Sequence, residues 1–230
     1  MSSKTPKGPD NVTRNLVIGM VALVVAVGAI FSVISNRENT SAALPSSVSQ
    51  DDGYGIVFNG DLTGVPVVDI WEDFQCPVCA RFTQTNGDYI EKLIEEKKAK
   101  VVFHTLSFLG PESVLAANAA ACASDENKFL GFHRAFYQNL PAENSGAVTA
   151  DYLVALGQGV GITSDKFKSC VANLDYNGWV NNVAASGGEA NVNSTPTVFV
   201  NGKEIRRATS GADLGDYFDP AAFARAVEGK

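Results

Sequence analysis

The sequence is poor in the residues that build metal centres. Its 230 residues include two histidines, His104 and His133, and four cysteines. A structural zinc site needs a second close cysteine pair or nearby histidines, and Cys122 and Cys170 stand 48 positions apart. We therefore expect no metal centre, and no residue pattern indicates a cofactor.

Clusters of positive charge are also scarce. The formal net charge is -7, and the chain from Glu38 onward contains 14 basic and 24 acidic residues. Basic residues gather there in nothing larger than Lys97-Lys98 or Arg206-Arg207. Phosphate-rich partners are repelled by such a surface, so we expect no nucleic-acid binding. Internal repeats are absent, and a composition of 45% hydrophobic and 19% charged residues predicts one globular domain with short appendages.

One long apolar run stands near the amino terminus. Residues 16–35 carry no charge, and 20 residues of helix just span a membrane. A cleaved signal peptide is the alternative, with small residues at 41–43 as the cleavage site. The basic residues before the run place the amino terminus in the cytoplasm. We therefore predict a cytoplasmic tail at 1–15, a single transmembrane anchor at 16–35 in the cell membrane, a flexible linker at 36–52 and an extracytoplasmic domain at 53–230.

The pattern after residue 53 predicts an α/β fold. Gly55–Phe58, Val65–Trp71 and Val101–Leu106 are short β-branched runs typical of buried strands. A helical pattern from Cys76 to the charged residues near 100 joins the second run to the third, as in a right-handed parallel crossover. Several helices follow between Pro111 and about Ala190. A hairpin turning at Asn201-Gly202 and a helix at Pro220–Val227 close the chain.

Cys76 and Cys79 stand where the second strand passes into this helix. In an oxidising compartment an even number of cysteines indicates disulfides. A C-P-V-C sequence in the first helical turn can close a disulfide, and unpaired backbone N–H groups there favour a thiolate at Cys76. We predict that Cys76 is a redox nucleophile and Cys79 the resolving thiol. An inert stapling disulfide is the alternative.

Three features of the sequence together resemble the DsbA-like branch of the thioredoxin superfamily. They are the motif D-F-Q-C-P-V-C at Asp73–Cys79, the helical stretch that follows the crossover, and the motif S-T-P-T-V-F-V-N-G at Ser194–Gly202. The resemblance implies a thioredoxin fold with a helical insertion at about 108–190. It also implies that Pro196 is cis beside the cysteines, so that the Thr195 backbone pairs with an extended client segment. Pro77 and Val78 join Thr195 as predicted client-binding residues.

Two departures from this family concern the chemistry. Many relatives carry His or Tyr between the cysteines, whereas Val78 offers Cys76 neither a charge nor a hydrogen bond, so we expect a milder oxidant. Relatives often place a carboxylate six residues before the nucleophile, where this chain has Ile70. Strand alternation puts Glu72 on the same face as Ile70, which makes Glu72 the candidate proton shuttle. A solvated surface acid is the alternative.

The remaining notable residues receive structural interpretations. Cys122 and Cys170 fall in two predicted helices and are expected to form a structural disulfide, with a second redox pair as the rival hypothesis. His104 and His133 are interpreted as core or boundary residues rather than ligands or bases.

The resemblance implies an oxidase that donates the Cys76–Cys79 disulfide to unfolded exported proteins and is reoxidised by a quinone-linked membrane partner. A disulfide isomerase or reductase is the first alternative. The second is a non-catalytic peptide-binding or chaperone module, or the extracellular part of a kinase-like assembly.

Overall fold

Two parallel strands form the centre of the structure. The computed structural model describes residues 41–207 and 215–229. Strand β3 (Val67–Asp73) and strand β4 (Lys100–Leu106) pair in parallel along their whole length, from Val67 opposite Lys100 to Asp73 opposite Leu106. Because both faces of a parallel pair are covered, their branched apolar residues are almost fully buried.

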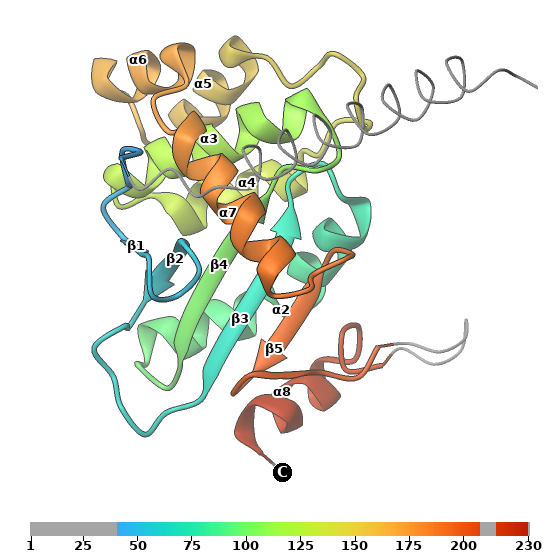
Figure 1. Ribbon diagram of the computed structural model, residues 1–230. Coiled ribbons are helices and arrows are strands. Elements are labelled where there is room, and N and C mark those ends of the chain that lie inside the picture. Colours follow the sequence, from blue (N-terminus) through green and yellow to red (C-terminus); the bar gives the residue numbers. More distant parts are fainter. Residues whose placement is uncertain (1–40, 208–214, 230) are drawn as a thin grey trace, which may run out of the picture. The chain divides into compact units, whose positions relative to one another are not determined.

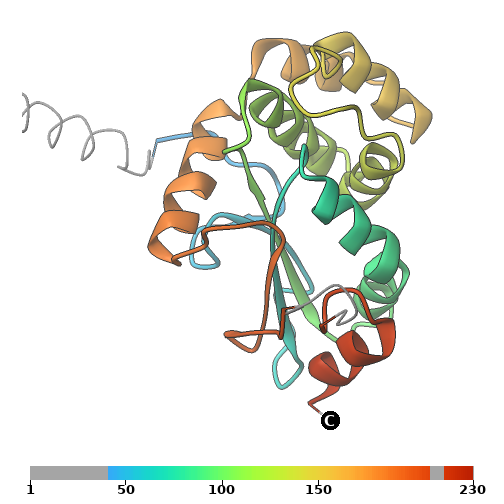
Figure 2. The ribbon, with the colours of Figure 1, turned by 90° about the vertical axis from the view of Figure 1, so that its right-hand side faces the viewer.

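Antiparallel strands extend this pair on both sides. The sheet order is β1-β2-β4-β3-β5-β6, where β1 is Val48–Ser49, β2 is Gly55–Phe58, β5 is Thr197–Val200 and β6 is Lys203–Glu204. Helix α2 (Pro77–Glu95) joins β3 to β4, as the sequence predicts. Figure 2 shows α2 and α8 (Pro220–Glu228) on one face of the sheet and α7 (Asn177–Glu189) on the other.

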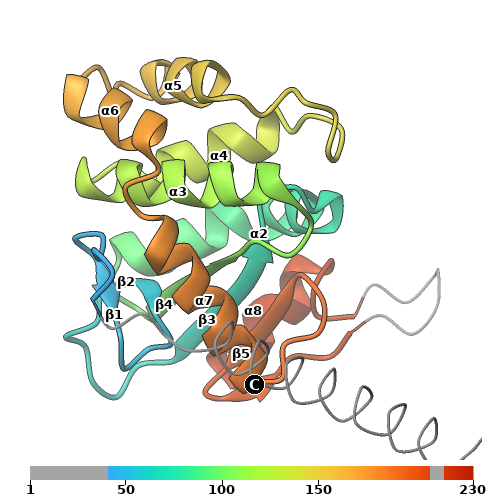
Figure 3. The same cartoon turned by 45° about the horizontal axis from the view of Figure 1, so that its top comes forward.

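The predicted insertion at about 108–190 also contained α7, which packs against β4 of the sheet instead, so that four helices remain between β4 and α7. They are α3 (Pro111–Asp125), α4 (Phe129–Gln138), α5 (Ala150–Gly159) and α6 (Asp165–Asn173), and they stack beyond one end of the strands (Figure 3). Side chains of Thr149 and Ser164 cap the first turns of α5 and α6 by accepting hydrogen bonds from the N–H groups of Tyr152 and Phe167. One face of α4 is aromatic and buried, and it packs against α2.

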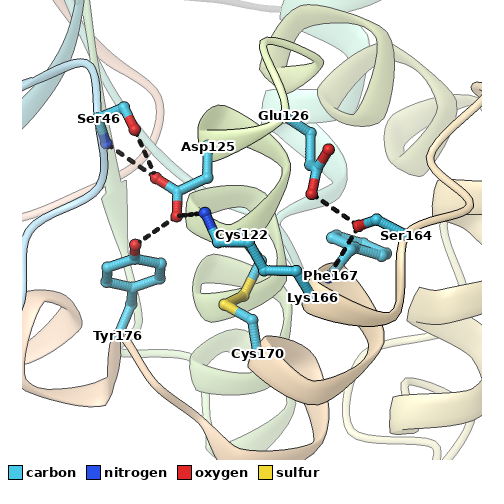
Figure 4. A network of polar contacts seen from close by, with 9 residues as sticks. All are labelled: Ser46, Cys122, Asp125, Glu126, Ser164, Lys166, Phe167, Cys170 and Tyr176. Carbon is cyan, nitrogen blue, oxygen red and sulfur yellow. Dashed lines mark hydrogen bonds and ion pairs between the residues drawn. A yellow bond between two sulfur atoms is a disulfide. The ribbon is translucent and has the colours of Figure 1, made fainter.

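A disulfide and the carboxylate of Asp125 link α3 to other segments of the chain (Figure 4). Cys122 of α3 and Cys170 of α6 are bonded, with their Cα atoms 6.0 Å apart. One turn further along α3, Asp125 accepts hydrogen bonds from the Tyr176 hydroxyl at 2.6 Å and from the Ser46 hydroxyl at 2.8 Å, and pairs with Lys166. Burial acts to raise the pKa of Asp125, but these hydrogen bonds outweigh it and lower the pKa.

The contact with Ser46 corrects the predicted linker. We expected a flexible tether as far as residue 52, but β1 at Val48–Ser49 pairs with β2 and Asp52 forms a 2.6 Å ion pair with Lys100. A two-residue strand among small polar residues leaves no periodicity in the sequence, so it could not be predicted. The predicted tail at 1–15, the anchor at 16–35 and the linker residues 36–40 lie outside the described residues. Within 41–207 and 215–229, no helix is both long and apolar enough to cross a membrane.

Candidate active site

The cysteine motif begins at the carboxyl end of β3. A tight turn follows Asp73, closed by a 2.9 Å hydrogen bond from the Cys76 N–H to the Asp73 carbonyl. Cys76 is the amino-terminal cap of α2, and Pro77 occupies the first helical position, where no backbone N–H is needed. The Cys76 sulfur accepts a hydrogen bond from the Cys79 N–H at 3.4 Å. The helix start thus holds both sulfur atoms in one turn.

The surroundings of Cys76 favour its thiolate. Its pKa is lowered from 9.0 to about 6, first by a hydrogen bond from Cys79 and then, against burial, by the Thr195 side chain and by backbone N–H groups of Val78 and Cys79. The side chain is 6% exposed. Cys76 is therefore the more readily ionised thiol of the pair, although it is almost completely buried.

Cys79 has the opposite character. It is completely buried, and its pKa is raised well above 9.0, first by burial, then by its hydrogen bond to Cys76 and by the negative charges of Cys76 and Glu72. It remains a neutral thiol at neutral pH. The two thiols thus differ in acidity, and their roles as nucleophile and resolving cysteine stay a prediction.

The loop before β5 brings a distant part of the chain to Cys76. The Thr195–Pro196 peptide bond is cis, as the resemblance implies. The Thr195 carbonyl oxygen lies 3.5 Å from the Cys76 sulfur, across a sequence separation of 119 residues. Pairing of β5 with β3, with Thr197 opposite Trp71, fixes this loop against the end of the strand that carries the cysteines.

Glu72 lies inside the protein next to the cysteine pair. Only 1% of it is exposed, so the alternative of a solvated surface acid is wrong. One carboxylate oxygen is 2.6 Å from Nε2 of His133, and the other is buried with no hydrogen-bond partner among the described residues. The charge of Glu72 acts on both Cys79 and Tyr137, raising the pKa of each. Glu72 is therefore a buried carboxylate whose charge acts on Cys79.

The sequence alone did not identify His133 as part of this site. It is buried, as expected for a core residue, yet it forms the ion pair with Glu72 from 61 positions further along the chain. His104 is also buried, stacked on Trp71 with ring centroids 3.7 Å apart. Asp73 was missed too, and its carboxylate accepts hydrogen bonds from Ser113 at 2.6 Å and from the Gln75 N–H at 2.9 Å. Apart from the local hydrogen bond between Gln75 and Asp73, each contact joins segments whose proximity depends on the tertiary fold.

Two large apolar side chains are exposed on the surface of the described residues. Val78 is 46% exposed, and Phe108, in the loop after β4, is 56% exposed. Phe108 also lines a groove of about 240 Å³ together with Val192 and Asn193. These two residues precede Thr195 by three and two positions. Val78 thus gives the cysteine motif an exposed apolar side chain, which is suited to contact with another polypeptide.

Comparisons with known proteins agree with this geometry. The family model described as thioredoxin matches residues 53–219. Disulfide bond formation protein D of Bacillus subtilis is 29% identical over 156 residues, which are 65% of this chain and 69% of that protein. The serine/threonine-protein kinase PknE of Mycobacterium tuberculosis is 26% identical over 185 residues, 74% of this chain. The chain spans 31% of the length of that kinase.

Solved structures show the same architecture. DsbA of Mycobacterium tuberculosis matches with a TM-score of 0.62 and 26% identity over 76% of this chain and 91% of its own. MdbA, a thiol-disulfide oxidoreductase from Actinomyces oris, matches in fold with a TM-score of 0.68 and 24% identity, covering 84% of this chain and 93% of its own. The chain therefore belongs to the thioredoxin family, and its homologues and structural neighbours include thiol-disulfide oxidoreductases of the DsbA type.

Proposed function

We propose that this protein is an extracytoplasmic disulfide oxidase that transfers the Cys76–Cys79 disulfide to unfolded exported proteins. The observation that carries the proposal is the contrast within the pair. Cys76 has a pKa of about 6, whereas burial holds the pKa of Cys79 well above its ordinary value. A stable thiolate at Cys76 makes it a good leaving group, which favours passing the disulfide on to a client.

The reaction has two steps. A client thiolate attacks the Cys76 sulfur, the bond between Cys76 and Cys79 breaks, and Cys79 leaves with the electron pair and then takes up a proton. A second client thiolate then attacks the client sulfur of the mixed disulfide, and Cys76 leaves as its stable thiolate. The client is oxidised by two electrons and the cysteine pair is reduced by two.

Glu72 is the proposed proton donor and acceptor for Cys79. Its buried carboxylate acts electrostatically on Cys79 and has one oxygen without a partner among the described residues. In reoxidation the same carboxylate takes the Cys79 proton as that thiol attacks the mixed disulfide. Thr195, Pro77 and Val78 are proposed to contact the client next to the Cys76 sulfur, with the Thr195 backbone pairing with an extended segment.

The proposal includes the cellular setting. The apolar run at 16–35 would hold the domain at the outer surface of the cell membrane, and a quinone-linked membrane protein would reoxidise the pair. Val78 gives Cys76 no hydrogen bond from its side chain, which supports an oxidant milder than relatives with His at that position.

The direction of electron flow is tested by trapping the cysteines in living cells. Acid quenching followed by thiol alkylation should find Cys76 and Cys79 mostly as a disulfide. A mostly reduced pair would instead support a reductase or isomerase. With purified full-length protein, oxidation of a reduced, unfolded client should need both cysteines.

The role of Glu72 is tested by Glu72→Gln, with Asp69→Asn as the matched control on the opposite face of β3. Gln cannot exchange the proton, so we expect client oxidation to slow by about 10²-fold while the protein stays folded. Asp69→Asn should leave the rate unchanged. An unchanged rate in Glu72→Gln would remove that carboxylate from the chemistry.

A further inference from the structure

A hydroxyl group fixes the loop that faces Cys76. This loop, Ser194–Pro196, ends where β5 begins, and its Thr195 carbonyl oxygen lies 3.5 Å from the Cys76 sulfur. The next residue, Thr197, is 3% exposed, and its hydroxyl donates a 2.6 Å hydrogen bond back to the Ser194 carbonyl. Because this bond spans Thr195, it sets the position of the backbone that the proposed function assigns to client binding.

A guanidinium group holds the same hydroxyl from the other side. Nη2 of Arg207 donates a hydrogen bond to the Thr197 hydroxyl oxygen at 2.6 Å. An arginine can only donate and a hydroxyl has one proton, so the Thr197 proton points to the Ser194 carbonyl. A charged donor also polarises the hydroxyl and strengthens the hydrogen bond that the hydroxyl makes in turn. Arg207 therefore acts on both the direction and the strength of the bond across the loop.

Arg207 is itself held in place, although its side chain is 41% exposed. Its Nε donates a hydrogen bond to the Glu204 carboxylate of β6. The guanidinium carbon also lies 5.3 Å from the centroid of the Tyr217 ring, within the range of a cation–π contact. That ring is fixed in turn, because the Tyr217 hydroxyl accepts a 2.9 Å hydrogen bond from the Val198 N–H. Glu204 and Tyr217 thus direct the guanidinium toward Thr197.

The shortness of β6 explains why side chains are needed at this edge of β5. Backbone pairing with β6 involves the last two residues of β5, Phe199 and Val200. Toward the start of β5, side chains bind this edge instead, with the Tyr217 hydroxyl at Val198 and the guanidinium of Arg207 at Thr197. The position of the loop therefore depends on contacts outside the sheet.

We propose that Arg207 positions the client-binding loop. Through the Thr197 hydroxyl, it holds the Thr195 backbone in the place where an extended client segment pairs with it. The proposal deepens the function proposed above and rests on it. Arg207 acts through Thr197 and does not touch the reacting sulfur. Because the loop binds client backbone, its position matters for a polypeptide thiol and not for a small thiol that contacts only the disulfide.

The test compares two reductants of the oxidised full-length protein in a mild detergent. A short extended peptide with two cysteines can pair with the loop, whereas dithiothreitol cannot. Acid quenching and mass spectrometry give a second-order rate constant for each, and the ratio of peptide to dithiothreitol measures the contribution of the loop. Arg207→Gln should lower this ratio about 3-fold, and Thr197→Val, which removes the hydroxyl with little change in shape, about 10-fold.

Three further variants show whether Arg207 acts through the hydroxyl. Arg206→Gln is the matched control, because it removes the same charge from the neighbouring residue, whose Nε lies 3.7 Å from the Asp216 carboxylate. It should leave the ratio unchanged. Thr197→Ser keeps the hydroxyl and should keep most of the ratio. The double variant of Arg207→Gln with Thr197→Val should fall no further than Thr197→Val alone.

Methylated peptides test the backbone pairing directly. Each peptide N–H next to the first client cysteine is replaced in turn by an N-methyl group, which cannot donate a hydrogen bond. At one position the change should slow the reaction of the wild-type protein about 10-fold. The same change should slow Arg207→Gln by less, because the loop of that variant already binds the backbone poorly. A loss of general stability would not produce this difference.

An unchanged ratio in Arg207→Gln, or an equal fall in Arg206→Gln, would overturn the positioning role of Arg207. The proposed function would survive that result if the wild-type protein still converts the peptide to its disulfide. A wild-type protein that accepts electrons from dithiothreitol but leaves the peptide reduced would instead overturn the proposed function.

Discussion

The ionisation of Cys76 predicts a specific dependence of stability on pH. Its pKa in the folded, reduced protein is about 6, against an ordinary value of 9.0. A lowered pKa stabilises the folded state fully above pH 9, and this stabilisation is lost as the pH falls through 6. The whole shift corresponds to about 4 kcal/mol. Between pH 5 and pH 8, linkage gives a gain of about 2 to 3 kcal/mol for the reduced protein.

The assay is urea-induced unfolding of the reduced full-length protein at several pH values, in a mild detergent to cover the apolar run at 16–35. Trp71 and Trp179 are both buried, so their fluorescence reports unfolding. The reference protein is the Cys76→Ser variant, which is measured under the same reducing conditions and retains every other titrating group. Subtracting its free energy of unfolding isolates the contribution of Cys76.

The difference between the two proteins should rise with pH by about 2 to 3 kcal/mol from pH 5 to pH 8. A difference that changes by less than about 0.5 kcal/mol over this range would refute the account of Cys76 as a stabilised thiolate. Direct titration of thiolate absorbance provides a second check. A pKa below about 4 would contradict the expectation that this site is milder than a C-P-H-C site.

Three further changes test other parts of the structure. Val78→His should lower the pKa of Cys76 below 6 and make the disulfide more oxidising, and an unchanged thiolate titration would show that this side chain does not act on the sulfur. Replacing Cys122 and Cys170 by Ala should lower the free energy of unfolding by about 4 kcal/mol with client oxidation retained, whereas lost oxidation would make them a second redox pair. Asp125→Ala should cost about 1–3 kcal/mol in thermal unfolding, and no loss would show that its hydrogen bonds contribute little.

Features governed by a few neighbouring residues were predictable from the sequence. The C-P-V-C motif and its place at the start of a helix follow from spacing and from Pro77. The caps at Thr149 and Ser164 follow from the residue type before a helical pattern. The parallel crossover from β3 through α2 to β4 follows from apolar periodicity.

Features that depend on tertiary contacts could not be predicted from the sequence. Strand alternation predicted the face of Glu72, but its burial depends on α4, which begins more than 50 residues later. His133 gave no signal in the sequence beyond an aromatic helix, so it was interpreted as a core residue only. The contact of Ser46 with Asp125 spans 79 positions and likewise left no local pattern.

The contact between Glu72 and His133 limits how this chemistry could be transplanted. The nucleophile, the resolving thiol and the carboxylate lie within eight consecutive residues, so a short graft could carry all of them into a smaller thioredoxin scaffold. Such a chimera would lack α4 and therefore the imidazole that faces the carboxylate. The insertion and the motif should then be exchanged together, because a donor loop alone would leave a buried acid without its partner.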